Sequence, residues 1–262
     1  MTETEALPLL AKPTFGEWLA AKLSRVTSSG DLIPEIDGLR FLAISSVLLH
    51  HTMSIYLRES QRSAVEVHSQ SVWADAGAHS WLVQLAYSGH FGVNLFFAIS
   101  GFILALPFAS RAFSNLPAPS LKNYYLRRVT RIEPPYAICL VIFFFFQWKV
   151  RHGVPSELFP HLLASLFYAH GLIYGAHSTI NSVAWSLEIE IQFYLLVPVL
   201  VKVFRLRNAL LRRGLLLGCI AGGGWLSQHV IYPSGSMPLI LSLANFAHYF
   251  LVGFLLADLY LG

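Results

Sequence analysis

Long apolar blocks, repeated along the chain, are the feature that most restricts how this sequence can fold. Several blocks contain roughly 17 to 25 residues, the length that a helix needs to cross the hydrocarbon core of a membrane. Such blocks must be helical, because lipid offers no hydrogen-bonding partner to an open backbone. The alternating ten-residue pattern of a membrane barrel is not seen. The sequence therefore predicts an all-α, polytopic membrane helix bundle.

The composition agrees with a chain that folds in lipid. Hydrophobic residues make up 55% and charged residues 12%, whereas soluble domains carry about a quarter charged residues. The net charge of +4 does not indicate nucleic-acid binding, because the basic residues form short clusters between the apolar blocks. Cys139 and Cys219 both lie within apolar blocks, which predicts buried thiols rather than a disulfide or a metal site. We expect no bound cofactor.

The apolar blocks give a bundle of about six spans and one shorter segment. The spans are expected at 39–57, 87–108, 134–148, 183–201, 215–231 and 238–260. The segment 161–174 is short for a span and is expected to be re-entrant or interfacial. Residues 1–33 are predicted to be a cytoplasmic tail and residues 34–262 a transmembrane domain.

The distribution of Lys and Arg predicts the orientation of the bundle. Three clusters, before or at the start of the first span, between the second and third, and after residue 201, hold 14 of the 18 basic residues. All three are cytoplasmic if basic loops stay inside. This arrangement requires an even number of crossings between the second and third clusters, so 161–174 must not cross. The N-terminus is then cytoplasmic, and membrane lipids are partners of the chain.

The first span carries ionisable residues at both ends. Arg40 and His51 are eleven residues apart, which places them within ~20° on one helix face and roughly 16 Å apart along it. His50 points about a quarter turn away. Ionisable groups in a membrane helix are functional candidates by default. The alternative is that Arg40 reaches the inner headgroups while His51 lies at the outer interface.

A second polar group lies where the span 183–201 begins. It contains Trp185, Ser186, Glu188 and Glu190. The two glutamates are about 200° apart on a helix, so we expect one of them to meet water or headgroups. Ser186 and Glu190 share a face. The alternative interpretation is a pair of interfacial glutamates beside an aromatic-belt tryptophan.

These groups together predict a site that extends across the membrane. His51 and Glu190 both fall near the outer side, where a carboxylate can orient an imidazole as a general base. Guanidinium groups of the inner side suit a phosphate-rich ligand, namely those of Arg40, Arg128 and Arg131. The alternative role of these arginines is topology and anionic-lipid binding. Asn94 and Ser100 on the second span can support the site by hydrogen bonding across helices, although packing is the commoner role.

Four motifs occur in order. The first is Asp37-Gly38-Leu39-Arg40 with His51 after ten intervening residues, and the second is Gly92-Val93 through Phe96-Phe97 to Ser100-Gly101-Phe102. The third is Arg128-Val129-Thr130-Arg131-Ile132 followed by Pro134-Pro135-Tyr136, and the fourth is Trp185-Ser186-Leu187 with Glu190, Gln192, Phe193 and Tyr194. With these motifs, the chain from about Ile36 onward resembles the membrane acyltransferase 3 family, which includes bacterial O-antigen and exopolysaccharide O-acetylases.

The resemblance implies an O-acyltransferase of the bacterial inner membrane that modifies polysaccharide. Acyl-CoA, especially acetyl-CoA, would be the donor, and a hydroxyl of a glycan or lipid-linked carbohydrate the acceptor. His51 would be the catalytic base or acyl carrier and Glu190 its acidic partner, while Arg40, Arg128 and Arg131 would bind the donor. The family usually has about ten spans, so the chain is expected to be a piece of such a domain. The rival interpretations are a proton-coupled transporter or flippase of an anionic cargo and a non-catalytic membrane sensor.

Overall fold

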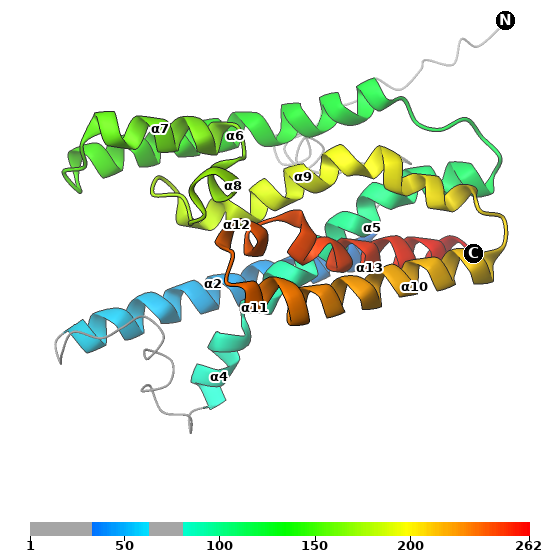
Figure 1. Ribbon diagram of the computed structural model, residues 1–262, viewed down its shortest axis with the longest axis horizontal. Helices are drawn as coiled ribbons and strands as arrows, with labels where there is room; N and C mark the ends of the chain where they lie inside the picture. Colours follow the sequence, from blue (N-terminus) through cyan, green and yellow to red (C-terminus); the bar gives the residue numbers. More distant parts are fainter. Residues whose placement is uncertain (1–32, 63–80) are drawn as a thin grey trace, which may run out of the picture. The chain divides into compact units, whose positions relative to one another are not determined.

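The computed structural model describes residues 33–62 and 81–262. The expected tail at 1–33 lies outside the described residues except for Ile33. The chain divides into two units, Met1–Pro34 and Glu35–Gly262, and the second contains everything discussed below. All elements of the described residues are helical, which confirms the all-α prediction for that part of the chain (Figure 1).

The helices follow one another with short connections. In chain order they are α2 (Pro34–Arg62), α4 (Trp81–Ser88), α5 (Phe91–Phe113), α6 (Leu121–Lys149), α7 (Pro155–Leu166), α8 (His170–Tyr174), η1 (Ser182–Ala184), α9 (Trp185–Leu200), η2 (Val201–Arg205), α10 (Ala209–Leu226), η3 (Ser227–Ile231), α11 (Tyr232–Ser234), α12 (Met237–Ile240) and α13 (Leu243–Leu261). The segment expected at 161–174 divides into the end of α7 and the short α8.

Four stretches of the described residues are long and apolar enough to span a membrane: Trp81–Phe113, Leu121–Lys149, Ala209–Ser234 and Met237–Leu261. The spans expected at 39–57 and 183–201 are helical, as α2 and α9, but do not belong to these four. Arg40, His50 and His51 lower the hydropathy of α2, and α9 has only 16 residues.

Helix α6 begins earlier than the sequence predicted. The expected span started at Pro134, but α6 starts at Leu121 and contains both Pro134 and Pro135. Arg128 and Arg131 therefore lie on a helix and not in a connecting loop. The two arginines and the apolar half of α6 belong to one continuous helix, so the helix fixes the positions of both side chains.

Helices α5 and α13 cross in close contact because each presents a glycine at the crossing. A Cβ at Gly101 would overlap the backbone oxygen of Phe250, and one at Gly253 would overlap the backbone oxygen of Ala98. Small residues allow such close approach in membrane helix pairs. The aromatic ring of Phe250 also stacks on Phe193 of α9, with ring centroids 4.0 Å apart. These contacts hold α5, α9 and α13 together.

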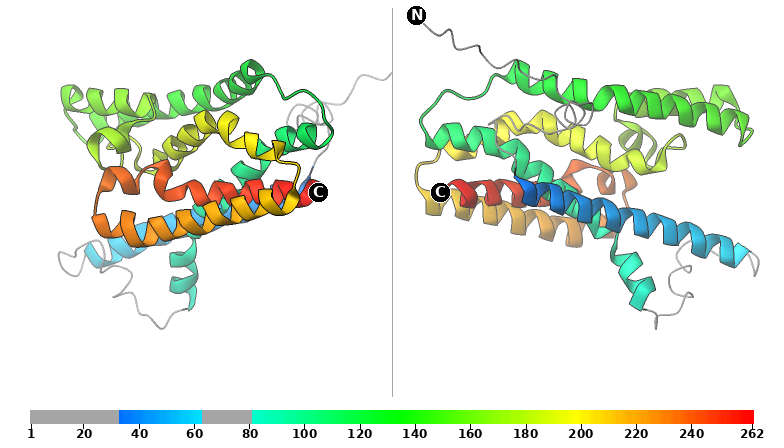
Figure 2. Two further views of the ribbon diagram at one scale, coloured as in Figure 1. Left: turned by 45° about the vertical axis from the view of Figure 1, so that its right-hand side comes forward. Right: turned by 180° about the vertical axis from the view of Figure 1, so that it is seen from behind.

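Helix α9 lies between α6 and α13 in the views of Figures 1 and 2, and its polar side chains attach it to several neighbours. Glu188 accepts a hydrogen bond from the backbone N–H of Gly171 in α8, at 2.9 Å. Gln192 accepts one from the backbone N–H of Leu243 at the start of α13, also at 2.9 Å.

Glu188 is only 2% exposed. Of the two glutamates, Glu188 is therefore not the one that meets water, whereas Glu190 is partly exposed. Its carboxylate is directed away from Glu190, as the helical angle required, but the backbone of α8 covers it and supplies the hydrogen bond that water would otherwise provide.

An ion cluster joins the start of α10 to the end of α13. The carboxylate of Asp258, which is fully buried, accepts hydrogen bonds from Arg212 and from Arg213, the latter at 2.6 Å. The guanidinium of Arg212 also lies 4.5 Å from the ring centroid of Phe113 at the end of α5. The cluster therefore fixes the ends of three helices against one another.

Candidate functional site

A cavity of about 150 Å³ lies among four helices and is lined by four charged side chains. It takes Arg40 from α2, Ser100 from α5, Arg128 and Arg131 from α6, and Glu190 from α9. Ile103, Leu104, Ile132 and Tyr194 complete the lining. The lining holds three guanidinium groups against one carboxylate, so its net charge is positive.

Glu190 is held at the cavity by two hydroxyl groups. Ser100 Oγ donates a hydrogen bond to Glu190 Oε1 at 2.6 Å, and the hydroxyl of Tyr194, one helical turn further along α9, donates to the same oxygen. The first bond joins α5 to α9. A carboxylate that accepts such bonds is fixed in one orientation.

Arg128 lies against aromatic rings and has a free donor. Its guanidinium carbon is 6.0 Å from the ring centroid of Tyr124 and 5.7 Å from that of Tyr194. Its Nε atom is buried and has no hydrogen-bond partner among the described residues. A buried donor left unpaired costs about 1–3 kcal/mol. The cavity therefore offers a cationic donor that a bound anion can satisfy.

The other two arginines differ in their environments. Arg40 is partly buried and its Nη1 lies 3.3 Å from Oδ1 of Asp37, one turn earlier on α2. Arg131 is exposed at one side of the cavity. Forked guanidinium groups bind phosphate and carboxylate oxygens in pairs, and this cavity is lined by three of them.

The structure brings five of the predicted site residues together, namely Arg40, Ser100, Arg128, Arg131 and Glu190. His51 does not line this cavity. It is exposed on α2, and its ring makes an edge contact with that of His50 at a centroid distance of 5.5 Å. The predicted contact between His51 and Glu190 is therefore wrong for this structure, because the carboxylate is held by Ser100 and Tyr194 among the arginines.

His50, rather than His51, attaches α2 to α4. Its Nδ1 lies 3.1 Å from the backbone oxygens of both Ala86 and Tyr87, and this nitrogen must be the donor because a carbonyl can only accept. His90 donates from its own Nδ1 to the oxygen of Tyr87 at 2.6 Å. His51 is therefore adjacent in sequence to His50, whose ring is held by these hydrogen bonds.

The remaining predicted residues lie outside the cavity. Trp185 packs its ring against Phe246, with centroids 5.4 Å apart, and Ser186 Oγ donates to the backbone oxygen of Val183 at 3.5 Å. Asn94 lies on α5, six residues before Ser100, and is partly buried.

Sequence reasoning missed Tyr124 as a member of the site. The signal was its position four residues before Arg128, the spacing that places two side chains on the same helix face. Because the helix was expected to begin only at Pro134, this spacing had no structural meaning in the sequence.

Comparison with known proteins gives the family. A family model described as an acyltransferase domain matches residues 33–262. The chain is 27% identical over 222 residues to the peptidoglycan O-acetyltransferase OatA of Listeria monocytogenes, covering 79% of this chain and 30% of that protein. It is 25% identical over 180 residues to the O-acetyltransferase OatA of Staphylococcus aureus (strain NCTC 8325 / PS 47), covering 64% of this chain and 24% of that protein. The chain thus spans about a quarter to a third of the length of these relatives. No solved structure matches.

Proposed function

The chain belongs to the acyltransferase-domain family, whose model covers residues 33–262, and we propose from this premise that it transfers an acyl group from acyl-CoA to a carbohydrate hydroxyl. The acyl group is acetyl, since the relatives are O-acetyltransferases by name. The acceptor is a glycan or a lipid-linked carbohydrate, because one relative is named for peptidoglycan.

The observation that carries this proposal is the arginine cavity. Coenzyme A bears several phosphates, and the cavity offers three guanidinium groups, one of them with an unpaired Nε. Neither Arg128 nor Arg131 forms a salt bridge within the described residues. A phosphate group would supply the missing acceptors. The cavity of about 150 Å³ accommodates part of the donor and not the whole molecule.

His51 is the residue proposed to perform the chemistry. It lies on the same face of α2 as Arg40, roughly 16 Å along the helix, and a flexible arm joins the phosphates of coenzyme A to its thioester. The donor can therefore lie along this face, with its phosphates at the arginines and its thioester near His51. As a base, His51 removes the proton of the acceptor hydroxyl. The new C–O bond forms, the C–S bond breaks, and the thiolate leaves and is protonated.

A covalent variant uses the same residue. The imidazole attacks the thioester carbonyl, carries the acyl group, and then yields it to the hydroxyl. This variant suits a donor and an acceptor on opposite sides of the membrane. Ping-pong kinetics or a trapped acyl-enzyme distinguishes it from direct transfer.

Glu190 has a different proposed role from the one expected from the sequence. Its carboxylate fixes Ser100 and Tyr194 and lies among the arginines, where it adds a negative charge beside the proposed donor site. The negative charge of Glu190 therefore weakens donor binding and favours the release of coenzyme A. His51 then depends on the fixed His50 and on the substrate for its orientation.

The proposed location is the bacterial inner membrane with a cytoplasmic N-terminus. The end of α6 that carries Arg128 and Arg131 faces the cytoplasm, where acyl-CoA is made and where basic residues accumulate. The later residues of α2, which carry His51, then face outward. Anionic lipids contact the remaining basic residues.

The test measures thiol release from acetyl-CoA by the purified protein in the presence of a chito-tetrasaccharide as acceptor, with His51→Ala beside His50→Ala. The proposal predicts that His51→Ala abolishes acyl transfer, while His50→Ala retains part of it and loses stability. Equal activity of His51→Ala and wild type would remove His51 from the mechanism. Uptake of an anionic cargo without thiol release would instead indicate a transporter.

A further inference from the structure

Two histidines outside the arginine cavity are joined side chain to side chain. His161 on α7 and His170 at the start of α8 lie with Nδ1 of the first 2.8 Å from Nε2 of the second. His170 is 1% exposed, whereas His161 is partly exposed. No group of three metal-binding side chains occurs in the part of the chain that the structure describes, so the pair does not form a metal site there.

The hydrogen bonds determine which nitrogen carries each proton. His170 Nδ1 lies 3.1 Å from the backbone oxygen of Ala176, and a carbonyl can only accept, so this nitrogen is protonated. Burial lowers the pKa of His170, so the ring is neutral and its Nε2 is an acceptor. His161 must then donate from Nδ1. In the neutral tautomer that donates from Nδ1, Nε2 of His161 is an acceptor, and it has no hydrogen-bond partner among the described residues.

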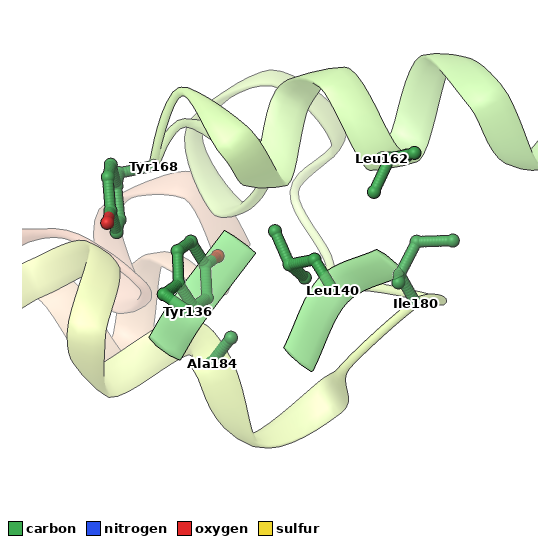
Figure 3. Packing of buried hydrophobic residues seen from close by; sticks show 6 residues of the cluster. All are labelled: Tyr136, Leu140, Leu162, Tyr168, Ile180 and Ala184. Carbon is green, nitrogen blue, oxygen red and sulfur yellow. The ribbon is translucent and has the colours of Figure 1, made fainter. Parts of the chain in front are cut away.

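The segment that carries this pair is firmly supported. Glu188 of α9 accepts the N–H of Gly171, and the hydroxyls of Ser165 and Ser178 are hydrogen bonded at 2.8 Å. Beneath it, Tyr136 of α6 stacks on Tyr168 with centroids 4.8 Å apart, within the cluster drawn in Figure 3. The position of His161 is therefore determined by α6, α8 and α9.

An exposed aromatic ring completes the surface. Tyr174 at the end of α8 lies with its ring centroid 4.2 Å from that of His161 and 4.8 Å from that of His170. It is 41% exposed. A few well-placed polar groups beside aromatic rings are typical of small-molecule sites. Here an acceptor nitrogen lies beside a large, half-exposed ring.

We propose that His161 and Tyr174 form a docking subsite for the carbohydrate acceptor. A sugar hydroxyl donates its hydrogen bond to His161 Nε2, and the sugar ring packs against Tyr174. This inference rests on the proposed function. Helices α7 and α8, which carry the two residues, lie toward the same end of the bundle as the later residues of α2, the helix that carries His51 (Figure 1). The acceptor and His51 are then on the side opposite the donor phosphates.

The experiment measures binding of a chito-tetrasaccharide to the purified full chain without donor. His161→Asn keeps an amide donor where Nδ1 was, so it can still bond His170, but it removes the outward acceptor. We expect the Kd to rise about 2- to 12-fold, the range for one neutral hydrogen bond. His161→Gln can restore an oxygen near the Nε2 position, so its Kd should lie nearer to wild type.

Tyr174 and a remote histidine provide the matched controls. Tyr174→Phe keeps the ring and should bind as wild type, whereas Tyr174→Ala should weaken binding. His152→Asn makes the same exchange at an exposed histidine before α7 and should change nothing. Unfolding temperatures of all variants show whether the fold is kept, and a variant that unfolds early is replaced by its conservative partner.

The outcomes separate this inference from the proposed function. Weaker sugar binding by His161→Asn and Tyr174→Ala, with the Kd for coenzyme A unchanged, supports the subsite. Binding by His161→Asn equal to wild type, or no saturable binding by wild type, overturns it. If wild type binds the sugar but releases no thiol when the sugar and acetyl-CoA are both present, the proposed function fails while the subsite stands.

Discussion

Replacing Arg128 with Ala tests the arginine cavity most sharply, because its Nε atom is a buried donor without a hydrogen-bond partner among the described residues. The change removes a guanidinium that is proposed to bind a donor phosphate. A hydrogen bond to a charged group contributes about 1.5–3 kcal/mol. The Kd for coenzyme A should therefore rise about 12- to 140-fold, since 1.4 kcal/mol corresponds to a factor of ten.

Arg127→Ala is the matched control for this prediction. Arg127 is exposed, precedes Arg128 in α6, and projects about 100° away from it. Both variants lose one positive charge, so any general effect of net charge on an anionic ligand is the same. Arg127 does not line the cavity, and its loss should change the Kd by no more than about 5-fold, as for an exposed charge pair.

The assay is equilibrium binding of coenzyme A to the purified proteins at fixed ionic strength, because salt screens exposed charges more than buried ones. Arg128→Lys should lie between Arg128→Ala and wild type, since it keeps the charge and loses the fork. An unpaired buried donor destabilises the fold, so its removal in Arg128→Ala should not lower the unfolding temperature. A weaker Kd for coenzyme A would then reflect lost binding and not lost folding. Equal Kd values for Arg127→Ala and Arg128→Ala would refute a specific phosphate site at Arg128.

Two further predictions concern charges on neighbouring helices. Glu190→Gln keeps an oxygen that can accept hydrogen bonds from Ser100 and Tyr194 but removes the negative charge. Coenzyme A should therefore bind about 1.4- to 5-fold more tightly, the range for a partly exposed charge interaction. Weaker binding would show that the carboxylate supports the donor site. Asp258→Asn leaves the buried Arg212 without its carboxylate and should cost about 3–5 kcal/mol of stability. Arg213→Gln, at a side chain that is 30% exposed, should cost less than ~1 kcal/mol of stability. Thermal unfolding in detergent compares the two variants, and equal losses of stability would contradict the structural role of the buried Arg212–Asp258 pair.

The convergence of the arginines was predictable from the sequence. The positive-inside rule placed Arg128 and Arg131 on the inner side of the membrane, beside Arg40. The cavity contains all three. Topology was sufficient here because the charge pattern defines the depth at which each of these residues lies.

The partners of the two glutamates were not predictable in the same way. The angle of about 200° between Glu188 and Glu190 on a helix correctly predicted that their side chains point in different directions. The angle does not say which residues each side chain meets. Glu188 meets the backbone of α8, a helix of five residues, and such a short element leaves little periodic signal in the sequence. Glu190 was assigned to His51 by its depth alone, whereas Ser100 and Tyr194 hold it at the arginines.

The start of α6 was misplaced for a local reason. Pro134 and Pro135 usually mark a helix start or a break, because proline lacks an N–H and restricts the preceding residue. Helix α6 instead continues through both. Packing of Tyr124 and Tyr136, both buried, holds its two halves in the bundle, and tertiary contacts of this kind are not visible in local sequence.

One face of α2 is proposed to accommodate both ends of the donor, with phosphates at the arginines and the thioester at His51. Photolabelling by a coenzyme A thioester whose acyl chain carries a diazirine, followed by mapping of the labelled peptide, tests this placement. We expect label on α2 around His51, which excess coenzyme A displaces and which Arg128→Ala greatly reduces at the same thioester concentration. Label on α10 or α13 with none on α2, or label on α2 that excess coenzyme A does not displace, would contradict it.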